Sequence, residues 1–180
     1  MPTSTAQGTV NGPVSMRQPP GLHEQIDLWL CHHMHAVSFC KDILLIAARW
    51  DDLIDRDQIL LDTEVHQLME VTLSLPCNPF YIQHFIALST LIHNSVRNWK
   101  AANALERNDA SDETALMNAF ILRSSYIDVL CHCAMLVKDN EWAEHVAYEA
   151  RLFFSREGFA QYLQSLKRER EARHGNVRDR

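Results

Sequence analysis

The sequence has few of the residues that interrupt helices. It contains 5 glycines and 6 prolines among 180 residues, and four of the prolines precede Gly21. No stretch of useful length alternates apolar and polar residues as a strand does. The sequence also lacks a glycine-rich phosphate loop, a serine nucleophile elbow and a dinucleotide fingerprint. It therefore gives no support for the enzyme classes that depend on these motifs. Long helices are therefore expected throughout.

Positive charge and long apolar runs are scarce as well. The 17 Lys and Arg residues against 23 Asp and Glu give a net charge of −6. This balance argues against a nucleic-acid partner, although Lys167 to Arg180 is locally basic. No run of eighteen apolar residues is free of charge, so no membrane span is predicted. The five cysteines are odd in number and lie mostly in apolar helical runs, which predicts reduced thiols in a cytoplasmic protein.

The hydrophobic content of 47% suits a single domain with its own core. We predict an all-α fold, a single bundle of about six helices, over residues 22–170. Residues 1–21 are predicted to be a disordered arm and residues 171–180 a charged flexible tail. The nearly all-apolar helix from Glu113 to Lys138 is expected at the centre. The helices are expected at residues 22–55, with a bend near 32–38, and at 62–75, 79–107, 113–138, 139–156 and 159–170.

The chain's clearest chemical signal is a group of acids that follows the apolar run Ile43–Ala48. On a helix, Asp51, Asp52 and Asp55 can converge on one point because residues three and four apart share a face. Carboxylates so close repel one another unless a cation neutralises them. Mg²⁺ takes such hard oxygen ligands, usually together with a substrate phosphate. A solvated acidic helix end is the other interpretation.

The pattern Asp-Asp-x-x-Asp at residues 51–55 resembles the aspartate-rich motif of the isoprenoid-synthase superfamily. The resemblance covers Arg49 to Asp57. It implies that the aspartates hold Mg²⁺ ions, that these ions bind a substrate diphosphate, and that the fold is a smaller version of the isoprenoid-synthase helical bundle. The chain is shorter than a usual isoprenoid synthase and has no second such motif. Its nearest substitute is Asn94, Asn98 and Glu106. The rest of the sequence resembles small helical proteins of tailed phages and prophages, which implies no chemistry.

Two charged residues stand out in the apolar helix at 113–138. Arg123 and Asp128 would be costly to bury without partners. In one interpretation Arg123 contacts a phosphate and Asp128 is a fourth carboxylate of the acidic cluster. In the other, Arg123 forms an internal salt bridge with Asp51, Asp52 or Asp55.

Two functions follow from these alternatives. The first is Mg²⁺-dependent binding or turnover of a diphosphate-containing small molecule, with substrate contacts from Arg123 and Asn98. The second is a non-enzymatic helical interaction protein of phage type, with a protein partner or a homodimer, whose aspartates form a salt-bridge network. An apolar cavity above the aspartates favours the first function, and Arg123 bonded to Asp51 or Asp55 in a filled core favours the second. The metal ligands predicted under the first function are Asp51, Asp52, Asp55 and Asp128.

Overall fold

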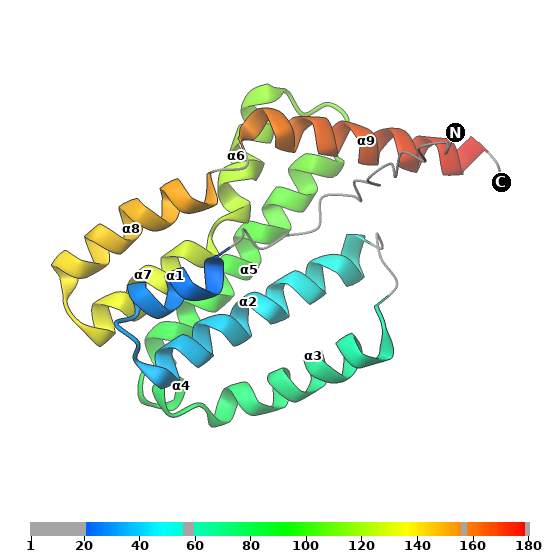
Figure 1. Cartoon of the computed structure of the whole chain (residues 1–180). Helices are drawn as coiled ribbons and strands as arrows, with labels where there is room; N and C mark the ends of the chain where they lie inside the picture. Colours follow the sequence, from blue (N-terminus) through cyan, green and yellow to red (C-terminus); the bar gives the residue numbers. More distant parts are fainter. Residues whose placement is uncertain (1–20, 56–59, 156–157, 179–180) are drawn as a thin grey trace, which may run out of the picture.

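The structure of the chain, a computed structural model, describes residues 21–55, 60–155 and 158–178, without the side chains of Asp55 and of residues 171–178. No strand occurs in these ranges, which confirms the all-α prediction. The expected six helices are nine α-helices here, because several predicted helices are broken (Figure 1). The predicted arm, Gly21 apart, lies outside the described residues. The elements are α1 (Leu22–Trp29), α2 (Met34–Asp55), α3 (Asp62–Ser74), the 3₁₀ turn η1 (Leu75–Cys77), α4 (Pro79–Gln83), α5 (Phe85–Arg107), α6 (Glu113–Arg123), α7 (Tyr126–Val137), α8 (Asn140–Phe154) and α9 (Phe159–Arg178).

The first break separates α1 from α2 and confirms the predicted interruption of residues 22–55. Cys31 and His32 take φ values of 50° and 55°. This left-handed conformation is strained for residues with a Cβ and cannot continue a helix. The Nδ1 atom of His33 then accepts a hydrogen bond from the backbone amide of Ala36 at 3.3 Å. This bond satisfies one of the amides at the start of α2 that have no partner within the helix.

The prediction of one continuous helix from Glu113 to Lys138 is wrong, because the helix breaks at Ser124 and Ser125. The Ser124 hydroxyl donates to the Ile121 carbonyl at 2.7 Å, and the Ser125 amide bonds to the Leu122 carbonyl three residues back. Serine side chains compete in this way with the regular helical hydrogen bonds and can bend or end a helix. The break leaves Arg123 as the last residue of α6.

The main core lies around α7, which gives α7 the central place that was predicted for the whole 113–138 helix. Leu130 and Cys133 of α7 are completely buried and pack in one cluster with Phe39 of α2 and Val146 of α8. The other half, α6, lies in a second, smaller cluster with α9. That cluster contains Leu116, Phe120, Phe159, Tyr162, Leu163 and Leu166.

Residues Glu113–Val137 are the one stretch, among those described, that is long and apolar enough to cross a membrane. A core helix can be equally long and apolar, and 39% of the most apolar part of this stretch is buried inside the bundle. The stretch is also divided between α6 and α7. It is weak evidence for a membrane span.

Two helices lie at opposite edges of the bundle (Figure 1). Helix α3 packs along α2, and none of its residues is buried. Helix α9 packs on α6 and continues to Arg178, beyond the end near Arg170 that the sequence predicts. Because α9 lies at the edge, its polar contacts help to hold it on the bundle. Two of its residues make these contacts at the candidate site.

Candidate functional site

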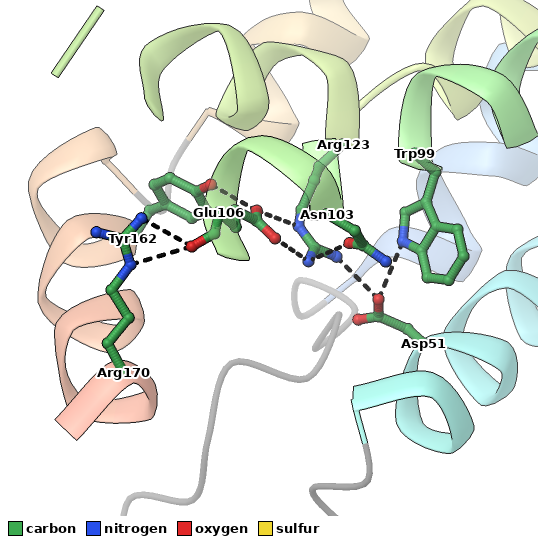
Figure 2. Close-up of polar contacts among 7 residues, drawn as sticks. All are labelled: Asp51, Trp99, Asn103, Glu106, Arg123, Tyr162 and Arg170. Atoms are coloured by element: carbon green, nitrogen blue, oxygen red, sulfur yellow. Dashed lines mark hydrogen bonds and ion pairs between the residues drawn. The ribbon is translucent and has the colours of Figure 1, made fainter. Parts of the chain in front are cut away.

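Arg123 is the centre of a largely buried polar network between α2, α5 and α6 (Figure 2). Its Nε and Nη2 donate to the two carboxylate oxygens of Glu106 at 2.6 and 2.5 Å. Its Nη1 donates to Asp51 Oδ1 at 2.8 Å, and Nη2 also donates to Asn103 Oδ1 at 2.8 Å. The side chain of Arg123 is 17% exposed and that of Asp51 only 2%. The geometry therefore places one cation between two carboxylates with little access to water.

The spacing of residues on α5 explains one wall of the network. Trp99, Asn103 and Glu106 follow one another at intervals of four and three residues and so share one face of the helix. The Trp99 indole donates to Asp51 Oδ1 at 3.0 Å. The acceptor oxygen of Asp51 is thus held by donors from two different helices, which fixes α2 against α5 and α6.

Asp52 takes part in a neighbouring contact with Arg49. The guanidinium of Arg49 lies 3.4 Å from Asp52 Oδ2 and 2.8 Å from Glu64 Oε1. Since Glu64 is on α3, this contact joins α3 to the acidic end of α2. Asp51 therefore pairs with Arg123 and Asp52 with Arg49.

Glu106 also connects the network to α9. The Tyr162 hydroxyl donates to Glu106 Oε1 at 2.5 Å. Arg170 donates from Nη2 to the backbone carbonyl of Glu106 at 2.7 Å and to that of Asn108 at 3.0 Å. These carbonyls at the end of α5 have no partner within their helix, and a guanidinium is a suitable donor for them. Figure 2 shows Tyr162 and Arg170 of α9 both directed towards Glu106.

The charges of the network are tightly coupled. Burial works to lower the pKa of Arg123, but the carboxylates of Glu106 and Asp51 outweigh burial and raise this pKa above its ordinary value. Burial raises the pKa of Tyr162, and the hydrogen bond to Glu106 raises it further. Arg123 therefore stays charged and Tyr162 stays neutral over the whole physiological range.

Tyr162 should make the fold sensitive to alkali. Because its pKa is higher in the folded state than the ordinary value of 10.0, the folded chain keeps a proton that the unfolded chain has lost. The stabilisation is complete below pH 10 and is lost progressively as the pH rises from 10 towards the higher folded-state pKa. Urea unfolding at pH 9 and pH 11 should show a smaller loss of stability for Tyr162→Phe than for the wild type. An equal loss in both proteins would contradict this assignment.

Of the other predicted site residues, Asp128 pairs with a different arginine. Asp128 is about half exposed and pairs with the equally exposed Arg151 at 2.8 Å, so its apolar neighbours in sequence did not bury it. Asn98 is partly buried on α5, and Asn94 is exposed. The side chain of Asp55 lies outside the described residues. Within the described part of the chain, no three His, Cys, Asp or Glu side chains gather in a way that could hold a metal ion.

Four members of the network were not among the predicted site residues: Trp99, Asn103, Tyr162 and Arg170. The polar pair Asn103 and Glu106, one turn apart on the same face as Trp99, was the signal available for α5. Glu106 was expected to substitute for a second metal motif beside Asn94 and Asn98, and not to be a partner of Arg123. No signal of this kind pointed to Tyr162 and Arg170, because they meet Glu106 only through the tertiary packing of α9.

An open groove of about 490 Å³ lies at the other end of α2, lined by residues between Asp27 and Asp42. It does not include the Arg123 network. Chemically, the network can hold three helices and α9 in register through charge-assisted hydrogen bonds.

The fold and the site together define an all-α protein with a buried arginine–carboxylate network. Comparisons with protein-family models, with curated proteins and with solved structures find no match to this chain.

Proposed function

We propose that this chain is a non-enzymatic helical interaction protein, and that the Asp51–Arg123–Glu106 network stabilises its fold rather than binding a substrate. One observation carries the proposal. Arg123, the residue that would contact a phosphate, directs its Nε, Nη1 and Nη2 groups to protein acceptors. A guanidinium offers five N–H donors, and the contacts with Glu106, Asp51 and Asn103 use four of them.

The surface supports the same proposal. Large apolar side chains are exposed on several helices, among them Trp50 and Leu53 on α2, Phe85 and Ile86 on α5, and the α3 residues discussed below. Contiguous exposed apolar side chains on a folded domain are typical of sites that bind other macromolecules.

The magnesium hypothesis stays a prediction: Asp51, Asp52, Asp55 and Asp128 would hold Mg²⁺, and a diphosphate would bind at Arg123 and Asn98 in a reduced isoprenoid-synthase-like bundle. In this arrangement a diphosphate would have to replace Glu106 or Asp51 as a partner of Arg123. The two hypotheses make opposite predictions for the same experiment.

The experiment combines a ligand titration with a mutation. We expect no change in melting temperature and no heat of binding when Mg²⁺ and pyrophosphate are added to the wild type, because Arg123 and the carboxylates already bond to one another. We also expect Asp51→Asn to destabilise the fold by roughly 1–3 kcal/mol, since it weakens a charge-assisted hydrogen bond in a buried setting. The matched control Asp128→Asn removes an acid from an exposed pair and should have little effect.

The magnesium hypothesis predicts a different result for the same measurements. If the acids form a metal site, they repel one another in the free protein, and Asp51→Asn leaves the fold intact or slightly more stable. Saturable binding of Mg²⁺ that tightens with pyrophosphate and disappears in Asp51→Asn would overturn the proposal.

A further inference from the structure

Helix α3 carries a stripe of exposed apolar side chains. Leu61, which precedes its first residue, and Val65, Met69 and Leu73 are 66%, 38%, 56% and 74% exposed. They are spaced four residues apart and therefore follow one side of the helix over about 18 Å. No residue of α3 is buried.

This helix depends on contacts that the described chain supplies only in part. A helix of 13 residues is marginal in water unless an apolar face is covered. Leu68 and Val71 are partly buried, whereas the stripe is open to solvent. Figure 1 shows α3 at the edge of the bundle with α2 beside it. A second helix laid along the stripe would cover it and complete the packing of α3.

The charges of α3 indicate what kind of helix would fit. The helix contains Asp62, Glu64 and Glu70 and no lysine or arginine. Arg49 neutralises Glu64, while Asp62 and Glu70 are exposed. Two copies of this chain joined through α3 would bring the acids of both helices together, and like charges so placed repel. Charge complementarity therefore favours a different, basic partner over a second copy.

We propose that the α3 stripe binds an amphipathic helix of a partner protein whose apolar face is flanked by lysine or arginine. This inference rests on the proposed interaction function and names the class of its partner. The apolar side chains of such a helix pack between Leu61 and Leu73 in the helix-in-groove mode. Its basic flank lies beside Asp62 and Glu70, which speeds association and selects the partner by charge.

An unbiased selection tests the proposal. A displayed library of helical peptides of about 16 residues, long enough to match the stripe, is selected for binding to the full chain. We expect enriched peptides with apolar residues at i, i+4 and i+7 and with Lys or Arg beside them. Met69→Glu should weaken binding of a recovered peptide at least about tenfold. The matched control Leu152→Glu, on α8 and 51% exposed, should leave binding unchanged.

Each other outcome has a defined meaning. Enriched peptides without basic residues, or an affinity that salt does not weaken, would overturn the charge argument. Peptides that bind Met69→Glu as well as the wild type would overturn the α3 site while leaving the interaction function standing. A dimer in sedimentation equilibrium that Met69→Glu dissociates would show a second copy on α3 and overturn the basic partner. An empty selection overturns the inference, and failure of the interaction function itself shows separately as saturable binding of Mg²⁺ and pyrophosphate.

Discussion

Replacing Arg123 by methionine should lower the free energy of unfolding by roughly 3–5 kcal/mol, the usual cost of leaving buried charges without their partner. Methionine keeps much of the side-chain volume and removes the charge. Asp51, 2% exposed, and Glu106, 6% exposed, would then face each other without the cation between them. Urea unfolding monitored by circular dichroism at 222 nm measures the loss.

Arg151→Met is the matched control for this experiment. Arg151 also forms an ion pair at 2.8 Å, but both it and Asp128 are about half exposed. Exposed pairs contribute between zero and about 1 kcal/mol, so this variant should unfold at nearly the wild-type urea concentration. Equal effects of the two substitutions would contradict the structural role of the network.

A charge-removing combination separates the cost of unpaired charge from lost packing. Adding Asp51→Asn and Glu106→Gln to Arg123→Met removes all three charges and keeps acceptors for the Trp99 and Tyr162 donors. If unpaired carboxylates cause the destabilisation, the triple variant should recover most of the lost stability. A triple variant that is less stable than Arg123→Met would assign the loss to packing instead.

Leu130→Ala should cost about 2–5 kcal/mol, as expected for a large-to-small substitution at a buried leucine. Leu130 is completely buried in α7 and packs in the main core. Leu116→Ala, in the smaller cluster of α6 and α9, should cost less because fewer buried side chains surround it. Leu152→Ala, on the exposed side of α8, should change stability by no more than about 0.5 kcal/mol.

The comparison of Leu130 with Leu116 tests how the structure divides the apolar 113–138 segment. Were this segment one central helix, its two halves would be equally sensitive to truncation. A loss at Leu116 as large as that at Leu130 would show that α6 is as central as α7.

The amino-acid sequence determined the features that depend on near neighbours. The scarcity of glycine and proline predicted helices. One helix was expected to begin at residue 79, and α4 does begin there, where the Asn78 side chain accepts hydrogen bonds from two backbone amides. Asp139 likewise caps α8. These signals are readable because caps and helix propensities act over a few residues of chain.

The tertiary structure decided which charged residues are buried together. Arg123 and Asp128 are equally conspicuous in an apolar stretch, yet the turn at Ser124 and Ser125 lies between them. Arg123 is turned inward to Asp51, and Asp128 lies on the surface with Arg151. Burial depends on which helices pack together, and spacing along one helix does not contain that information. For the same reason the sequence indicated the acids of α2, whereas only the packing of α5 and α9 showed that Glu106 and Tyr162 complete their network.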